Sequence, residues 1–129
     1  MTAAVNHCVL VVDDDRDICE VIQTILELQG YEVLTARDGA DALAQLRAGA
    51  RPSVIILDLM MPRMNGLQFR DEQTRDPALR AIPVVVLSGD GKAEAKGAAL
   101  GVQGLRKPVE LAALLDAVQR SSRASSGAG

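Results

Sequence analysis

Short apolar runs that end at polar side chains constrain the fold of this chain most strongly. Three such runs occur: Cys8–Val12 is followed by Asp13-Asp14-Asp15, Val54–Leu57 by Asp58, and Val84–Leu87 by Ser88. Short runs of β-branched residues bounded by turn residues are typical of buried parallel strands. In open α/β sheets the chemistry gathers beyond the carboxyl ends of these strands. We therefore expect the polar side chains to lie together at one edge of a parallel sheet.

Helical patterns separate these strands. Apolar residues at helical spacing, and the breaks between them, predict helices over Ile18–Leu26, Ala40–Ala48, Leu67–Arg75, Ala93–Leu100 and Leu111–Val118. Two further strands are expected at Tyr31–Ala36 and Val102–Arg106. Strand and helix then alternate five times, so right-handed crossovers produce an α/β fold with a doubly wound, five-stranded parallel sheet and helices on both faces.

The length of 129 residues suits one domain. We expect residues 1–7 to be an N-terminal extension and residues 8–120 to form the folded domain. Residues 121–129, rich in Ser, Gly and Ala, are expected to form a flexible tail because they have nothing to bury.

Charge and hydropathy exclude several classes of protein. The net charge of −3 leaves no basic stripe for a phosphate backbone, so we expect no nucleic-acid binding. No apolar stretch approaches the ~20 residues of a membrane span, and the first residues lack a secretory signal. A cytoplasmic protein with no membrane partner is expected. Cys8 and Cys19 have no metal-ligand spacing and are expected to be free thiols.

The clustered carboxylates predict a metal site. Carboxylates brought together repel one another unless a cation neutralises them. The donors are hard oxygens with no thiolate or imidazole among them, which suits Mg²⁺, with Mn²⁺ as a substitute. Magnesium also bridges carboxylate and phosphate oxygens. Lys107 could neutralise a phosphoryl oxygen, the Ser88 hydroxyl could hydrogen-bond another, and Asp58 is the natural nucleophile.

Together these motifs resemble the receiver domain of two-component response regulators. The resemblance is carried, in order, by Val11–Asp15, Ile56–Pro62 with Asn65-Gly66, Val86–Gly89 and Lys107-Pro108. It covers residues 8 to 120 at nearly the family spacing. The resemblance implies a flavodoxin-like sheet of order 2-1-3-4-5 and a role in signal transduction as a phosphoprotein.

The resemblance also implies a role for each site residue. Asp58 would accept a phosphoryl group from a phosphohistidine donor. Asp14, Asp58 and the Met60 backbone carbonyl would bind Mg²⁺ directly, with Asp13 acting mainly through water. The Lys107-Pro108 peptide would be cis. The partners would be a sensor histidine kinase or histidine phosphotransferase and a downstream protein target, and we expect a monomer or weak dimer.

One position departs from the family pattern. Receiver domains usually carry Tyr or Phe three residues before the lysine, where this chain has Gly104. We hypothesise that phosphorylation is instead read through the loops after Leu57 and Leu87 and through Ala93–Leu100.

Three functions are compatible with these motifs. The leading interpretation is a stand-alone phosphorylation switch or phosphorelay intermediate, which is not an enzyme beyond its own phosphorylation and dephosphorylation. The alternative is an interaction module that has kept the receiver fold but works without phosphorylation. The third, ranked last, is a Mg²⁺-dependent phosphatase with an aspartyl nucleophile among Asp13–Asp17, which would leave Asp58 unexplained.

Overall fold

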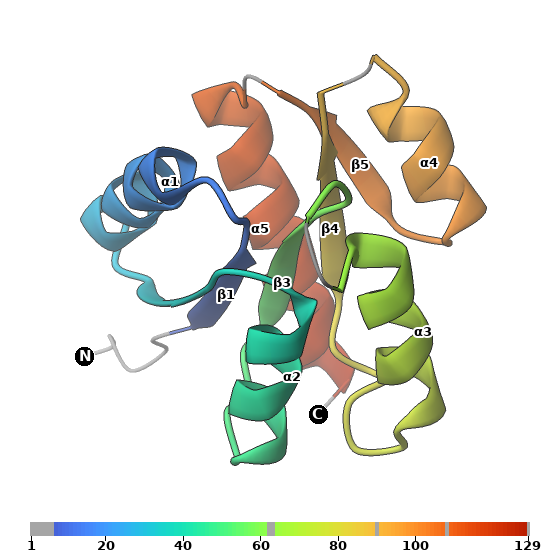
Figure 1. Cartoon of the computed structure of the whole chain (residues 1–129). Helices are drawn as coiled ribbons and strands as arrows, with labels where there is room; N and C mark the ends of the chain where they lie inside the picture. Colours follow the sequence, from blue (N-terminus) through green and yellow to red (C-terminus); the bar gives the residue numbers. More distant parts are fainter. Residues whose placement is uncertain (1–6, 62–63, 90, 108, 129) are drawn as a thin grey trace.

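The chain forms a five-stranded parallel sheet with helices on both faces (Figure 1). The computed structural model describes residues 7–61, 64–89, 91–107 and 109–128. The strands are β1 (Cys8–Val12), β2 (Glu32–Ala36), β3 (Val54–Asp58), β4 (Val84–Ser88) and β5 (Gln103–Arg106). They are ordered β2-β1-β3-β4-β5, and every neighbouring pair is parallel. The expected fold class and strand order are confirmed.

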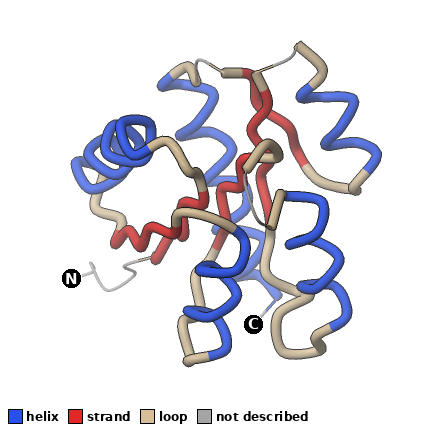
Figure 2. Tube along the Cα trace, in the orientation of Figure 1, coloured by secondary structure: helices blue, strands red, loops and turns tan. Residues whose placement is uncertain are grey.

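Strands alternate with helices along the chain (Figure 2). The helices are α1 (Arg16–Leu28), α2 (Gly39–Arg47), α3 (Gly66–Arg75), α4 (Ala93–Ala99) and α5 (Leu111–Ala128). Helices α1 and α5 pack on one face of the sheet, through residues such as Ile22, Leu26 and Leu114. Helices α2 and α3 cover the other face, through residues such as Leu46 and Phe69. This double cover explains why β3 and β4 are buried along their whole length.

Side-chain caps start the helices that follow β1, β2 and β3. The Asp15 carboxylate accepts hydrogen bonds from the backbone N–H groups of Asp17 and Ile18, and so caps α1. Asp38 caps α2, and Asn65 forms a capping box with Gln68 at the start of α3. Each cap fixes the residue at which a strand-to-helix loop ends and the helix begins. The caps therefore help to fix the loops at the carboxyl ends of β1, β2 and β3.

The end of the chain differs from the sequence expectation. Helix α5 continues through Ala128, so residues 121–128, which we expected to form a flexible tail, are helical. The buried side chains of Leu114, Ala117 and Val118 hold the first half of α5 against the sheet. Once those turns exist, each further residue extends the helix without a new nucleation cost. Helix α5 therefore extends over residues 121–128, although this segment is rich in Ser, Gly and Ala.

The structure also bears on the membrane and cysteine predictions. None of the helices in the described part of the chain combines the length and apolarity needed to cross a membrane. Cys8 and Cys19 are free, as expected, with Cys19 buried and Cys8 half-buried.

Candidate functional site

The strand register brings the predicted site residues to one edge of the sheet. Val12 lies beside Leu57, and Asp58 lies beside Leu87, so β1, β3 and β4 end next to one another. Asp13, Asp58 and Ser88 therefore meet at this edge, and all three are buried. Lys107 follows β5 directly, and its backbone N–H donates to the Ser88 carbonyl at 3.0 Å.

Three carboxylates form the centre of the site. Oxygens of Asp13, Asp14 and Asp58 all lie within 4.8 Å of one another, with Asp14 exposed and the other two buried. This arrangement exposes one carboxylate to solvent while two lie in a recess that water reaches poorly. The cluster can surround a cation that enters from the Asp14 side.

Lys107 supplies positive charge to the same cluster. Its Nζ lies 2.9 Å from Asp13 Oδ2 and 3.1 Å from Asp58 Oδ2. Partial burial by itself lowers the pKa of this ammonium group, but the contacts with the two carboxylates outweigh burial and raise it above its ordinary value of 10.5. Lys107 is therefore charged at neutral pH and bridges Asp13 and Asp58.

One oxygen of the Asp13 carboxylate is buried without a well-aligned hydrogen bond in the described part of the chain. Its Oδ1 accepts a hydrogen bond from the Asp15 backbone N–H at 2.9 Å. Its buried Oδ2 touches Lys107 but receives no hydrogen bond of good geometry from the described residues. Burial raises the pKa of the Asp13 carboxyl above 3.8, with the charge of Asp58 acting in the same direction. A buried carboxylate oxygen that touches Lys107 without a well-aligned hydrogen bond, next to two more carboxylates, fits a hard divalent cation.

The loop after Asp58 presents a backbone donor to the site. The Met60 N–H donates to Asp58 Oδ1 at 3.1 Å, and the Met60 side chain is 69% exposed. Helix α3 begins against this loop, because a Cβ on Gly66 would lie 2.9 Å from the Asp58 carbonyl oxygen and closer still to Leu59. The close approach of Gly66 thus holds the Asp58 backbone in place. The Met60 carbonyl as a metal ligand stays a prediction, and the Lys107-Pro108 peptide lies outside the described residues, since Pro108 is not among them.

Comparison with known proteins identifies the family of the chain. The family model of the response regulator receiver domain matches residues 9–119. The chain belongs to this family. The receiver domain is 40% identical to protein PilG of Pseudomonas aeruginosa over 114 residues, which cover 86% of this chain and 84% of PilG. It is also similar to the crystal structure of the chemotaxis response regulator CheY4 of Vibrio cholerae. Their TM-score is 0.81 at 37% identity, covering 91% of this chain and 99% of CheY4.

Some relatives are longer. The transcriptional regulatory protein CpxR homolog of Haemophilus influenzae is 35% identical over 91% of this chain, which spans 52% of that protein. This chain is therefore similar to only about half of that protein.

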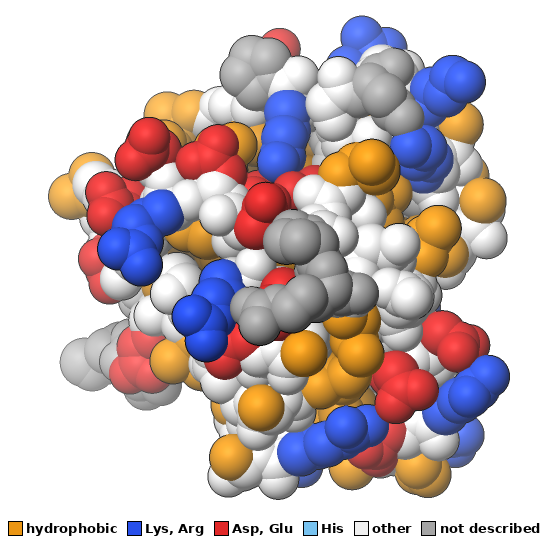
Figure 3. Space-filling model, viewed as in Figure 1, with side chains coloured by type: hydrophobic (Ala, Val, Ile, Leu, Met, Phe, Trp, Pro, Cys, Tyr) orange, Lys and Arg blue, Asp and Glu red, His pale blue; other side chains and the backbone are white. Residues whose placement is uncertain are grey.

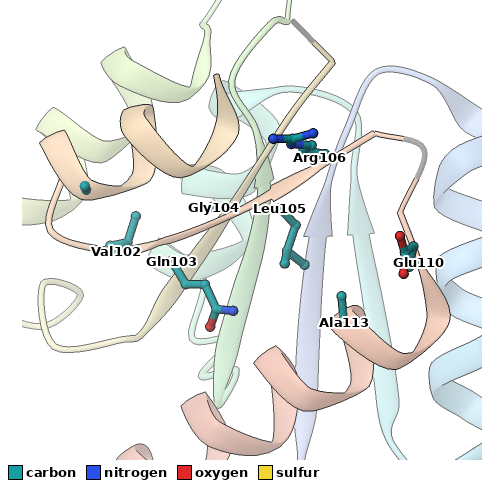
Figure 4. Close-up of a pocket in the computed structure, with 8 residues that line it drawn as sticks. Val102, Gln103, Gly104, Leu105, Arg106, Glu110 and Ala113 are labelled. Atoms are coloured by element: carbon teal, nitrogen blue, oxygen red, sulfur yellow. The ribbon is translucent and has the colours of Figure 1, made fainter. Parts of the chain in front are cut away.

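Gly104 leaves an open groove in this receiver domain, where the family usually has an aromatic ring. The groove has a volume of about 480 Å³ and is lined mainly by β5, with Ala113 of α5 beside it (Figure 4). Ala98 of α4 also belongs to the lining. Helix α4 also lies directly on the β5 backbone, since a Cβ on Gly97 would be 2.7 Å from the Gly104 nitrogen. The sequence already showed the missing ring, and the structure shows that the space remains open among the described residues.

Sequence reasoning missed the residues that surround the acids. The Cys19 thiol donates to the Asp13 carbonyl at 3.3 Å, and burial raises its pKa to about 11, so it is a neutral neighbour of the site. Arg16 and Arg37 line a separate hollow that opens onto Asp13 and Asp14. On the face shown in Figure 3, acidic side chains gather around this edge of the sheet, with separate basic side chains among them. No motif marked the two arginines, because Arg16 begins α1 and Arg37 follows β2.

Proposed function

We propose that this receiver domain is a phosphorylation switch that accepts a phosphoryl group from phosphohistidine onto Asp58, with Mg²⁺ bound by Asp13, Asp14 and Asp58. The observation that carries the proposal is the position of Lys107 Nζ. It lies about 3 Å from both Asp13 and Asp58, within a cluster of three carboxylates. The cluster supplies a nucleophile, a cation and an all-oxygen metal site in one recess.

The side chains have distinct roles in the transfer. An Asp58 carboxylate oxygen forms the new P–O bond while the P–N bond of the donor breaks, and the released imidazole nitrogen takes up a proton from solvent. Lys107 neutralises a phosphoryl oxygen, and the Ser88 hydroxyl hydrogen-bonds another. Bound Mg²⁺ supplies the positive charge that offsets the carboxylates and the incoming phosphoryl oxygens.

The surroundings favour a switch over a turnover enzyme. His7, the sole histidine of the chain, hydrogen-bonds Ser53 at the opposite edge of the sheet, where β1 and β3 begin. It is therefore remote from Asp58 and cannot serve there as a general base. The phosphatase alternative also needs a free acid two residues after Asp13, whereas Asp15 is engaged as the cap of α1. We propose that the domain promotes only its own phosphorylation and dephosphorylation.

The test is incubation with acetyl phosphate and Mg²⁺, followed by intact mass measurement. We expect wild type to gain one phosphoryl group and Asp58→Asn to gain none. Asp116→Asn is the matched control, because Asp116 is an exposed aspartate on α5 that pairs with Arg120. An adduct that persists in Asp58→Asn, or that forms equally with EDTA, would contradict the proposal.

The same variants separate the switch from the phosphorylation-independent module. A switch binds its protein target with different affinity before and after modification of Asp58. Equal binding by phosphorylated wild type, unmodified wild type and Asp58→Asn would favour the module.

A further inference from the structure

A single peptide unit joins two carboxylates of the acid cluster. Asp13 and Asp14 are adjacent in the chain, and both belong to the cluster with Asp58. The peptide bond between them is planar, so the direction of the Asp13 carbonyl marks the orientation of the whole unit. Turning that plane through the backbone dihedral on either side changes how the two side chains are directed relative to each other. A contact that holds the Asp13 carbonyl therefore influences the spacing of the two carboxylates.

The Cys19 thiol makes this contact. Its Sγ donates to the Asp13 carbonyl oxygen at 3.3 Å, and no other hydrogen bond from the described residues reaches that carbonyl. Separate contacts hold the other polar atoms of Asp13. Its N–H donates to the Ala36 carbonyl at 3.1 Å, and its Oδ1 accepts from the Asp15 N–H at 2.9 Å. Groups from β2, from α1 and from the loop between β1 and α1 thus fix this one residue.

Asp14 depends on the backbone for its position. Its carboxylate is exposed and makes no hydrogen bond or ion pair within the part of the chain that the structure describes. Only the peptide before it and its own rotamer set where its oxygens lie. If the thiol donor is lost, Asp14 samples a wider range of positions. A divalent cation that needs several oxygens around it then binds less tightly.

Cys19 is a rigid donor for this purpose. It belongs to the buried stripe of α1 with Ile22 and Leu26, which packs on the sheet. Its own N–H donates to the Asp15 carbonyl at 3.1 Å, within the first turn of the helix. Burial raises the pKa of the thiol to about 11, so the S–H proton is present at neutral pH. The donor is therefore held in place before any metal binds.

We propose that Cys19 is a positioning residue of the metal site, because its thiol holds the peptide between Asp13 and Asp14 and so directs the two carboxylates that bind Mg²⁺. This inference rests on the proposed function of the acid cluster. Cys19 acts through Asp13 and takes no part in bond making. Removing a group that orients a metal ligand weakens metal binding by about 10- to 100-fold. A thiol is a weak donor, so we expect the lower end of this range, about tenfold.

The experiment compares Cys19→Thr with Cys19→Val. The two side chains have nearly the same shape, but Thr keeps a hydroxyl donor and Val has none. Cys19 lines a hollow of about 400 Å³, and Val fills the position so that water from this hollow does not replace the donor. The measurement is the Mg²⁺ affinity of the full chain by calorimetry at room temperature, after circular dichroism has shown that each variant is folded. Under these conditions a loss of stability alone leaves the affinity unchanged.

We expect Cys19→Thr to bind Mg²⁺ nearly as tightly as wild type and Cys19→Val to bind it about ten times more weakly. Cys8→Thr and Cys8→Val are the matched controls, because Cys8 is a free, half-buried cysteine at the opposite end of β1, and these two should bind Mg²⁺ alike. With acetyl phosphate, the Cys19 variants should differ in the Mg²⁺ concentration that gives half-maximal labelling of Asp58. They should reach the same rate when Mg²⁺ is saturating.

The outcomes separate the two proposals. Equal Mg²⁺ affinity of Cys19→Thr and Cys19→Val refutes the positioning role, as does an equally large difference between the two Cys8 variants. If Cys19→Val does not fold, Cys19→Ser and Cys19→Ala supply the same comparison, and equal affinity of that pair refutes the role as well. In all these cases the acceptor stands if wild type binds Mg²⁺ and is labelled on Asp58. If wild type does neither, the proposed function itself fails.

Discussion

Replacing Lys107 with Met tests the electrostatics of the site most directly. The change keeps most of the side-chain length and removes the cation that touches Asp13 and Asp58. In the absence of metal, the variant leaves two buried carboxylates beside each other without a counter-charge. We therefore expect Lys107→Met to unfold at a lower temperature than wild type in EDTA.

The distances set the magnitude. At an effective dielectric constant of about 20, two unit charges about 3 Å apart attract by roughly 5 kcal/mol before desolvation is subtracted. Removing one partner from a fully buried pair costs about 3–5 kcal/mol. The Lys107 side chain is 20% exposed, so solvent screens part of this. We expect a loss of about 2 kcal/mol, or roughly 8 °C in Tm for a chain of this length.

Magnesium should reverse the loss. A ligand that binds only the folded state stabilises it in proportion to its affinity, and a site without the Lys107 charge attracts a divalent cation more strongly. Thermal unfolding followed by circular dichroism, in EDTA and in saturating MgCl₂, measures both effects. The gap between wild type and Lys107→Met should narrow with metal. Arg80→Met, which removes an exposed cation from the segment between α3 and β4, is the control and should show neither effect.

The pH dependence supplies a second readout. The pKa of Lys107 is raised in the folded state, so its contribution is complete below the ordinary value of 10.5 and is lost as pH rises through the higher folded value. The stability gap between the two proteins in EDTA should therefore close above pH 10.5. Equal stability of wild type and Lys107→Met at neutral pH in EDTA, or equal stabilisation of both by magnesium, would refute this account of the site.

Four further outcomes follow from single contacts. Asp15→Ala removes the cap of α1 and should cost about 1 kcal/mol in urea unfolding; no change would show that the cap is dispensable. Gly66→Ala places a Cβ within 3 Å of the Asp58–Leu59 backbone and should cost more than about 1 kcal/mol, whereas Gly89→Ala, with its nearest contact at 3.8 Å, should be nearly neutral. Magnesium affinity, measured by calorimetry, should fall with decreasing pH while the pH is still above 3.8, because burial raises the pKa of Asp13 and the proton competes with the metal; a fall confined to lower pH would argue against that shift. Finally, hydrogen exchange in α4 should change when a phosphoryl mimic binds, and unchanged protection would count against readout through this segment.

The polar residues at the ends of β1, β3 and β4 could be predicted because the pattern that marks them is local. Each strand is a short β-branched run, and each run ends at the residue that carries the chemistry. Parallel strands place their carboxyl ends at one edge whatever their order, so Asp13, Asp58 and Ser88 had to lie along that edge. The caps at Asp15 and Asn65 are local features as well, since a cap depends on side chains within a few residues. The family resemblance added the strand order and the expected metal ligands.

Distances between loops were not predictable in the same way. The sequence does not show that Arg37 lies two strands from Asp58, because that spacing depends on β1 lying between β2 and β3. It does not show that Met60 turns its N–H toward Asp58 either, or that Gly66 must approach Leu59 closely.

By itself, then, the sequence determined the periodicity of each element, the caps that begin the helices and the set of side chains at the strand ends. These depend on steric and hydrogen-bonding preferences within a few residues. The tertiary structure alone decided which carboxylate oxygens Lys107 touches, which cations stand beside the acids, and that α5 continues past Ser121. Those features arise when crossovers and packing bring distant segments together, and no local pattern records the resulting distances.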